Sequence, residues 1–156
     1  MSTTAATEPW IVEQHWDLTY QHTADPTTAT FLRTLRDDAK LLGSRCPVCQ
    51  RVLAPARPIC DRDFCRTDGL VELEPAGTLE LFTIMHLAID GLPEPPYALG
   101  YVKPHGADTS LPGFVEGVDL SSDAAAVAEL RIGREVEIAF RETRVGRITD
   151  LFFRLR

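Results

Sequence analysis

The four cysteines of this 156-residue chain all stand in one short segment that begins at Cys46 and ends at Cys65. Their spacing is C-x2-C-x10-C-x4-C, with Cys49 and Cys60 in the middle. Four thiolates that converge from two short turns make the tetrahedral sulfur shell that zinc prefers in a structural site. A segment this small has almost no apolar core, so metal binding must supply much of its folding free energy. The spacing therefore predicts a zinc ribbon with Cys46, Cys49, Cys60 and Cys65 as its metal ligands.

Iron and two disulfides are the alternatives to zinc that this spacing leaves open. The chain begins Met-Ser-Thr-Thr-Ala-Ala-Thr-Glu-Pro-Trp, without the basic and apolar regions of a secretory signal. We therefore expect a cytoplasmic protein, in which reduced thiols bind metal more readily than they form disulfides. A redox Cys-x-x-Cys motif would need only one of the two cysteine pairs, and it would need a strand-to-helix context.

Two features depart from the usual zinc knuckle. Gln50 follows the second cysteine, at a position that usually carries glycine because it tends to need a positive φ. A left-handed glutamine costs about 1–2 kcal/mol. The second pair of cysteines also has the longer x4 spacing, so we leave open that one distal ligand of the predicted set is misassigned or lost.

Composition sets broad limits on the rest of the chain. With 44% hydrophobic residues, it can form one ordinary core and a small appendage. No apolar run approaches the roughly 20 residues that cross a bilayer, so we expect a soluble protein without a membrane contact. The net charge of −7 disfavours a nucleic-acid partner, whose affinity depends on phosphate neutralisation.

Basic residues nevertheless gather around the cysteines. Between residues 40 and 66 the only acidic residues are Asp61 and Asp63, and the basic ones are Lys40, Arg45, Arg51, Arg57, Arg62 and Arg66. One interpretation is that these side chains merely solvate a ribbon with little core. The other is a phosphate-binding patch on an otherwise acidic protein.

Upstream of the cysteines, Asp25 and Pro26 predict the start of a helix, because Asp caps and Pro suits the first helical position. The helix is expected to end before Lys40, and residues 41–45 to form the strand that enters the ribbon. The arm before the helix is too apolar for a solvated tail, so we expect it to pack on its own domain or on a partner. Its large apolar residues are Trp10, Ile11, Trp16, Leu18 and Tyr20.

Downstream, a turn over residues 66–69 leads into a region rich in β-formers. The predicted strands cover residues 77–86, 97–102, 111–118, 134–140 and 147–155, and a short helix covers residues 124–130. The clearest alternation is in the fourth strand, where Val136, Ile138 and Phe140 are expected to face inward. Five strands with a helix between the third and the fourth match the OB-fold, a small Greek-key barrel.

The chain is therefore expected to be mainly β, in three parts. These are an N-terminal arm and helix (residues 1–39), a zinc ribbon (40–68) and a five-stranded OB-fold domain (69–156). The usual catalytic motifs are absent: the sequence has no Gly-rich phosphate loop, nucleophile elbow or His-Glu-x-x-His. A zinc ion bound by four cysteines keeps no open position. We therefore expect no complete active site, and among the isolated histidines His15, His22, His86 and His105 only His86 is of interest.

The order of these features resembles a known family. A helix precedes Leu-Leu-Gly-Ser-Arg-Cys-Pro-Val-Cys, then come Ala-Pro-Ala-Arg-Pro-Ile-Cys, Gly-Thr-Leu-Glu-Leu-Phe-Thr and the predicted barrel. Over residues 25–155 this looks like the small proteins that fuse a rubredoxin-like zinc ribbon to an OB-fold, known as domain of unknown function thirty-five. The x4 spacing, Gln50 and a longer insertion at residues 119–130 depart from the commonest pattern of that family.

The resemblance implies an accessory role in lipid metabolism, in β-oxidation-type degradation of steroids or aromatics. Proteins of this family accompany thiolase-superfamily enzymes, either thiolases or retro-aldolases, that make or cleave carbon–carbon bonds in acyl-CoA thioesters. The expected assembly is a hetero-oligomer, a dimer of heterodimers, in which the barrel docks on the thiolase-like subunit. The ribbon would help to bind CoA, whose phosphates suit arginine, with Arg45, Arg51, Arg57, Arg62 and Arg66 as candidates. The alternative is a single-stranded nucleic-acid binder, because OB-folds and zinc ribbons both serve that role.

Overall fold

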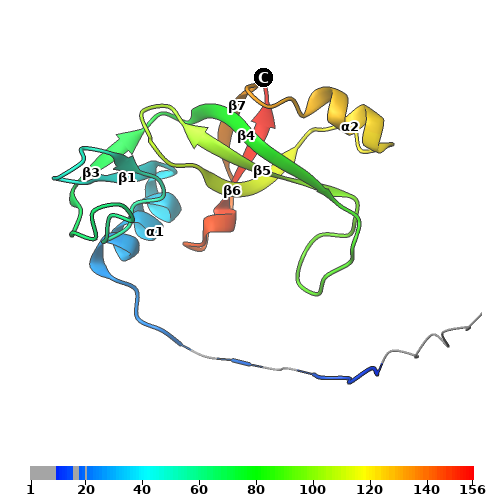
Figure 1. Cartoon of the computed structure of the whole chain (residues 1–156), viewed down its shortest axis with the longest axis horizontal. Helices are drawn as coiled ribbons and strands as arrows, with labels where there is room; N and C mark the ends of the chain where they lie inside the picture. Colours follow the sequence, from blue (N-terminus) through cyan, green and yellow to red (C-terminus); the bar gives the residue numbers. More distant parts are fainter. Residues whose placement is uncertain (1–9, 16–17, 20) are drawn as a thin grey trace, which may run out of the picture.

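The computed structural model describes residues 10–15, 18–19 and 21–156, and it places a helix, a small sheet and a closed barrel in that order along the chain (Figure 1). The elements are α1 (Pro26–Asp38), β1 (Leu41–Arg45), β2 (Val52–Leu53), β3 (Asp68–Leu73), β4 (Ala76–Met85), β5 (Tyr97–Pro104), β6 (Leu111–Glu116), α2 (Asp123–Glu129), β7 (Glu135–Phe140), the 3-10 turn η1 (Ile148–Asp150) and β8 (Leu151–Leu155). The mainly β fold predicted from the sequence is confirmed. No helix in these ranges combines the length and the hydrophobicity needed to span a membrane.

Helix α1 begins and ends where the sequence predicts. The Asp25 carboxylate accepts a hydrogen bond from the backbone N–H of Thr27 at 2.8 Å, and Pro26 occupies the first turn. Ala39 stops the helix in the left-handed conformation, with φ at 52°. The buried side chains of Phe31 and Leu35 belong to the main hydrophobic core, so the helix is held by tertiary packing.

The small sheet has the antiparallel strand order β2-β1-β3. Strand β3 begins at Asp68, and Arg66 forms an isolated β-bridge with Ile59, so the turn predicted for residues 66–69 is wrong. Asp68 pairs with Arg45 next to a β-bulge, and Gly69 adopts a φ of 74° there. Pairing with β1 therefore extends the strand into residues whose local preference is for a turn.

The five-stranded sheet closes into a barrel with the order β4-β5-β6-β8-β7, and β7 pairs back onto β4. Strands β6 and β8 are parallel, and the other neighbours are antiparallel. Val136 and Ile138 are buried as expected, and Phe140 is half-buried against the same core. This is the barrel that the alternation and the position of α2 predicted.

The last strand is shorter than predicted, because residues 148–150 form η1 instead of extended chain. The cause is the buried carboxylate of Asp150, whose Oδ2 accepts hydrogen bonds from the backbone N–H groups of Val145, Gly146 and Arg147 at 2.9, 2.7 and 3.0 Å. Three donors on one oxygen fold the chain into a tight loop, and β8 begins only at Leu151.

One hydrophobic core joins the small sheet to the barrel. Phe31, Leu41 and Leu73 on one side and Leu79 and Phe153 on the other belong to the same cluster of buried residues. Strand β3 also crosses the predicted boundary between residues 68 and 69. The division into residues 1–39, 40–68 and 69–156 stays a prediction.

The described part of the N-terminal arm runs away from the folded body (Figure 1). Trp10, Ile11 and Leu18 are 91%, 80% and 70% exposed, so these residues do not pack on their own domain. Trp16 and Tyr20, which belong to the same prediction, lie outside the described residues. A partner remains the expected contact of the arm.

Candidate metal centre

Two turns with the same hydrogen-bond pattern carry the cysteines. In the first, the backbone N–H of Cys46 donates to Arg51 O at 2.9 Å, and Gln50 N–H donates to Cys46 O at 3.1 Å. In the second, Cys60 N–H donates to Cys65 O at 2.9 Å, and Phe64 N–H donates to Cys60 O at 3.0 Å. The fourth residue after the first cysteine is left-handed in both turns.

The left-handed residues are Gln50, with φ at 62°, and Phe64, with φ at 52°. The positive φ that the sequence predicts for Gln50 is confirmed. The second turn needs the same backbone conformation, which was not predicted for Phe64. The carboxylate of Asp63, half-buried between the thiols, helps to hold that turn closed.

Because the two turns match, residues of different chemistry occupy equivalent positions in them. Cys46 corresponds to Cys60, and Cys49 corresponds to Asp63, because each stands three residues further on in the same hydrogen-bonded loop. Cys65 corresponds to Arg51. The residue at the usual place of the fourth cysteine is therefore Asp63.

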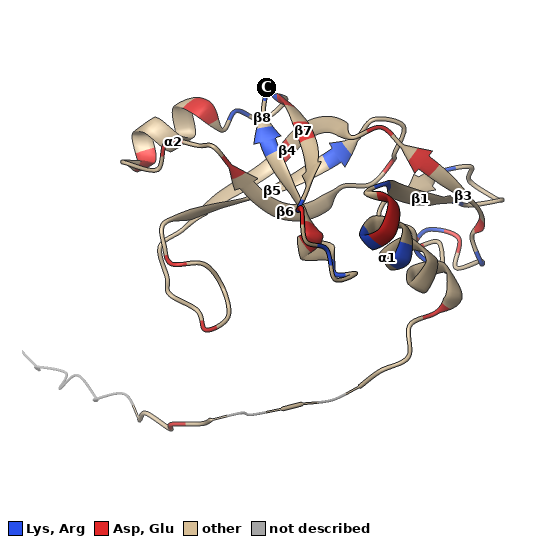
Figure 2. Cartoon of the chain, turned by 180° about the vertical axis from the view of Figure 1, so that it is seen from behind, with Lys and Arg blue, Asp and Glu red and all other residues tan. Residues whose placement is uncertain are grey.

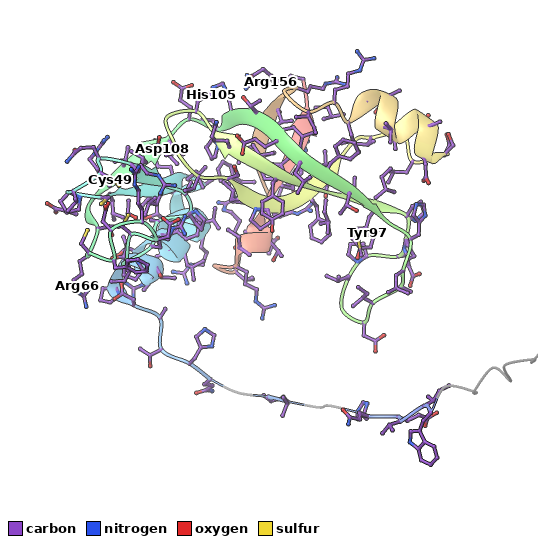
Figure 3. All side chains as sticks on the ribbon, viewed as in Figure 1. Cys49, Arg66, Tyr97, His105, Asp108 and Arg156 are labelled. Carbon is purple, nitrogen blue, oxygen red and sulfur yellow. The ribbon has the colours of Figure 1, made fainter. Side chains whose placement is uncertain are left out.

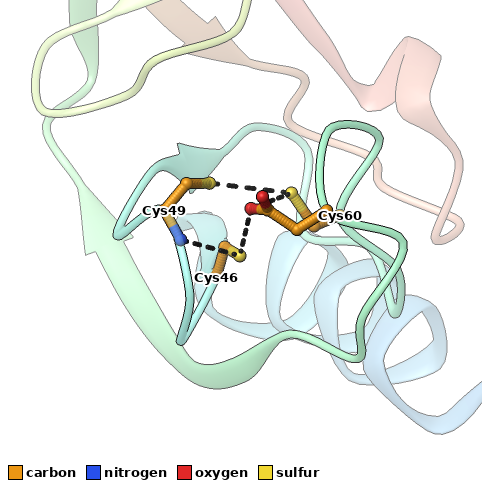
Figure 4. Close-up of side chains that lie close together, drawn as sticks. Cys46, Cys49 and Cys60 are labelled. Atoms are coloured by element: carbon orange, nitrogen blue, oxygen red, sulfur yellow. Dashed lines mark hydrogen bonds between the residues drawn. The ribbon is translucent and has the colours of Figure 1, made fainter.

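The distances between the possible metal-ligand atoms agree with the correspondence of Asp63 and Cys49 (Figure 4). Ligand atoms of Cys46, Cys49, Cys60 and Asp63 all lie within 4.8 Å of one another. Asp63 Oδ2 lies 3.2 Å from Cys46 Sγ and 3.6 Å from Cys60 Sγ, and Cys49 Sγ lies 3.8 Å from Cys60 Sγ. Tetrahedral zinc with bonds of about 2.3 Å to sulfur and 2.0 Å to oxygen needs sulfur–sulfur edges of about 3.8 Å and sulfur–oxygen edges of about 3.5 Å. These four side chains are positioned to bind a metal ion.

Cys65 also reaches the cluster, because its Sγ lies 3.6 Å from Cys46 Sγ. All four cysteines are free thiols, and Cys46 and Cys60 are buried while Cys49 and Cys65 are half-buried. The structure therefore brings together every metal ligand that the sequence predicts, together with one that it missed. Two side chains are therefore close enough to supply the fourth metal ligand, the carboxylate of Asp63 and the thiol of Cys65.

Asp63 and the neighbouring thiols shift one another's pKa values. Hydrogen bonds from the Cys49 and Cys46 thiols lower the pKa of Asp63. The same carboxylate is the main reason that the pKa of Cys49 rises to about 12. Burial, followed by the hydrogen bond to Cys46, raises the pKa of Cys65. A metal ion must displace the thiol protons, so its binding releases protons to solvent.

Asp63 was missed because sequence reasoning counted cysteines only. The signal was nevertheless present: Cys60-x2-Asp63 repeats the spacing of Cys46-x2-Cys49, and Asp is an accepted zinc ligand. In the described ranges, this is the one group of three or more metal-ligating side chains close enough to share an ion.

Arg45 ends β1, and the other candidate arginines lie on the loops beside β1 and β3, where Figure 2 shows basic residues. Arg45 donates to Gln50 O at 3.1 Å, Arg51 lies 3.4 Å from Asp61, and Arg66 lies 3.9 Å from Asp25. Arg62 is exposed within the second metal-binding turn, between Cys60 and Asp63. Arg57 is half-buried, and its Nε is buried without a hydrogen-bond partner among the described residues.

The histidines do not form a catalytic group in the described part of the chain. His86 follows β4 on the surface, with Nε2 at 3.0 Å from Asp123 Oδ1. His105 lies 3.0 Å from Glu135 and 3.7 Å from Glu74. His15 and His22 lie on the exposed arm, far along the chain from the cysteines. Each histidine therefore lies in a surface setting of its own.

Solved structures share this combination of helix, ribbon and barrel. A DUF35 family protein of unknown function from Sulfolobus solfataricus is 20% identical, with a TM-score of 0.58 over 84% of this chain and 86% of its own. A chain of the Ltp2-ChsH2(DUF35) aldolase is also 20% identical, with a TM-score of 0.63 over 86% of this chain and 98% of its own. The fold that the sequence resemblance implied is confirmed.

No family model matches this chain. No curated protein matches it either.

Proposed function

We propose that this chain is a non-catalytic accessory subunit that docks on a thiolase-superfamily enzyme and helps to bind its acyl-CoA substrate. The observation that carries the proposal is the fold shared, over 86% of this chain, with a chain of the Ltp2-ChsH2(DUF35) aldolase. The name of that enzyme joins a DUF35 component to a second component.

The metal in this proposal is a structural zinc ion held by Cys46, Cys49, Cys60 and Asp63. The correspondence of Asp63 with Cys49 favours the carboxylate over the Cys65 thiol that the sequence predicts. Four protein ligands leave no open position, so zinc would hold the two turns together and would not act on a substrate. Nothing in this role requires zinc to contact CoA.

Arg57 and Arg62 are the strongest CoA candidates among the predicted arginines. The side chains of Arg45, Arg51 and Arg66 already meet a carbonyl or a carboxylate. Arg62 is exposed, and the Nε of Arg57 is a donor for which the described residues supply no acceptor. The phosphates of CoA offer such acceptors, and a guanidinium can hold a phosphate through two parallel hydrogen bonds.

The first test is a calorimetric titration of the full chain with CoA. The double variant Arg57→Glu/Arg62→Glu should lose measurable CoA binding. Arg131→Glu/Arg147→Glu, with the same change of charge on the barrel, should bind as the wild type does. Equal binding by both variants would contradict the arginine assignment.

The second test is co-expression with a thiolase-superfamily protein encoded beside the gene of this chain. The two proteins should co-elute in size-exclusion chromatography, and Arg57→Glu/Arg62→Glu should still assemble. A chain that neither binds CoA nor co-elutes is not an accessory subunit of this kind. A salt-dependent shift of labelled single-stranded DNA would instead support the nucleic-acid alternative.

A further inference from the structure

Three neighbouring strands of the barrel, β4, β5 and β6, carry uncharged side chains on their outer side. Their register brings two residues of each strand into two rows, Leu81 with Tyr101 and Pro112, and Thr83 with Leu99 and Phe114. We call these six residues the barrel face. Apart from Thr83 they are aliphatic or aromatic, and Leu81 and Tyr101 are 55% and 47% exposed. The solvent side of an antiparallel sheet normally carries polar side chains, so this composition indicates a contact surface.

The outward direction of the barrel face follows from the residues between its members. Gly100 on β5 points inward, since a Cβ there would lie 2.8 Å from the buried side chain of Leu79. Gly113 on β6 also points inward, onto Phe153 of the core. Side chains alternate along a strand, so the residues on either side of both glycines point outward.

Two hollows of about 180 Å³ each lie on the barrel face. One reaches Leu81 and the other reaches Ile148 of η1, and they adjoin because Leu99 and Pro112 line both. A cavity of about 150 Å³ is enough to hold benzene, so each hollow can take one large apolar side chain. The described residues that line them are all uncharged, so a charged group that entered would lose its hydration without gaining a partner.

The N-terminal arm carries side chains of the kind that these hollows can take. Trp10, Ile11, Val12 and Leu18 are 91%, 80%, 65% and 70% exposed. The side chains drawn on the arm stand clear of the folded body (Figure 3). In a β-extended chain, residues two apart share a side, so Trp10 and Val12 can face one surface while Glu13 faces solvent. The arm therefore has apolar side chains to bury, and it does not bury them on its own barrel.

We propose that two copies of this chain exchange arms, so that the arm of each copy lies on the barrel face of the other. Both surfaces belong to one chain and are uncovered in the single copy, and exchange of identical segments is a low-cost route to a dimer. Tryptophan in an apolar pocket is a frequent anchor of protein interfaces, which assigns Trp10 to one of the hollows. The 15 residues between Trp10 and Pro26 span up to about 50 Å when extended, enough to reach a second copy. The inference needs neither CoA nor a thiolase-type partner.

The first measurement is the mass of the full chain by size-exclusion chromatography with light scattering, from micromolar to millimolar concentration. We expect twice the mass of one chain, falling to a single chain on dilution. Leu81→Glu should be monomeric over the same range, because it brings a charge into the barrel face. Trp10→Ser/Val12→Ser should also be monomeric, because the arm loses its anchors. A wild-type chain that is monomeric throughout would overturn the proposal.

Two matched variants serve as controls. Val127→Glu puts the same charge on an apolar side chain of α2 that is 51% exposed and lies outside the barrel face. Gln14→Ser/His15→Ser shortens two other exposed side chains of the arm. Both should dimerise as the wild type does. If the arm variant dimerises and Leu81→Glu does not, the copies bind face to face and the arm exchange is wrong.

Mixing the two monomeric variants tests whether the contact is between copies. Leu81→Glu keeps its arm, and Trp10→Ser/Val12→Ser keeps its barrel face. When the ¹⁵N-labelled arm variant receives unlabelled Leu81→Glu, amide shifts should appear at Thr83 and Leu99. The unlabelled arm variant, added in its place, should cause none. The absence of shifts with Leu81→Glu would mean that the arm does not bind a second copy, and the proposal would fail.

Discussion

The carboxylate of Asp63 lies 3.2 Å from the sulfur of Cys46, at the position in its turn that Cys49 holds in the other turn. This relationship makes the cluster a set of three thiols and one carboxylate, with Cys65 close beside it. The cysteine count alone predicted four sulfur ligands. Experiments on the fourth ligand therefore test both the geometry and the sequence interpretation.

The Asp63 and Cys65 variants should differ in metal binding. Asp63→Ala should lower zinc affinity by roughly tenfold or more, because it removes a ligand of a site with four. Cys65→Ser should keep zinc at one ion per chain with near wild-type affinity. Elemental analysis and competition with a chromophoric chelator measure both. The reverse result would restore Cys65 as the fourth ligand.

Removal of the metal should disorder the two turns before it affects the barrel. The buried part of the cysteine cluster is small, comprising Cys46, Leu53 and Cys60, whereas the barrel belongs to the large core. In hydrogen exchange after chelation, amides of Gln50 and Phe64 should lose protection, and those of Val102 and Ile138 should keep it. Unchanged protection at both turns would show that they fold without metal.

Replacement of Asp150 should destabilise the end of the barrel. Asp150 is 4% exposed, and its carboxylate accepts hydrogen bonds from the backbone N–H groups of Val145, Gly146 and Arg147. Asp150→Ala leaves these donors without their acceptor, so unfolding in urea should require about 2–4 kcal/mol less free energy. Asp150→Asn retains an acceptor oxygen and should lose less. Equal stability of Ala variant and wild type would mean that water replaces the carboxylate at no cost.

Gly77 should not tolerate a side chain. A Cβ at this position would lie 2.4 Å from the backbone oxygen of Lys103 on the paired strand β5. Gly77→Ala must therefore move two backbones apart and should destabilise the protein by about 1–3 kcal/mol, as overpacking does. The control is Gly43→Ala, where the nearest atom is the side-chain Cγ1 of Val52 at 2.8 Å. That side chain can shift, so the control should cost less in the same thermal unfolding measurement.

The sequence predicted those parts of the fold in which local chemistry and tertiary packing agree. Asp25 and Pro26 start α1, and Val136 and Ile138 alternate in β7, because the same residues satisfy both requirements. The prediction failed at Asp68 and at Ile148–Asp150. Pairing with β1 recruits Asp68 into a strand, and the Asp150 carboxylate organises a loop through bonds that no periodic pattern reveals.

The candidate sites differ in how visible they are in a sequence. The type and spacing of the cysteines indicate a metal centre, and a comparison of the two turns adds Asp63 to the candidate ligands. The candidate arginines have no such signature, because the sequence does not show that Arg45, Arg51 and Arg66 already meet a carbonyl or a carboxylate.

Val52, three residues after Cys49, exchanges two hydrogen bonds with Asp108 in the turn between β5 and β6. Its N–H donates to the Asp108 carboxylate, and its carbonyl accepts the Asp108 N–H, both at 2.8 Å. The Thr109 hydroxyl accepts the N–H of Ala54 and donates to the carbonyl of Ala54. These hydrogen bonds connect the segment after the first cysteine-bearing turn to the barrel. A partner that binds the barrel therefore also fixes the orientation of the arginine-bearing loops.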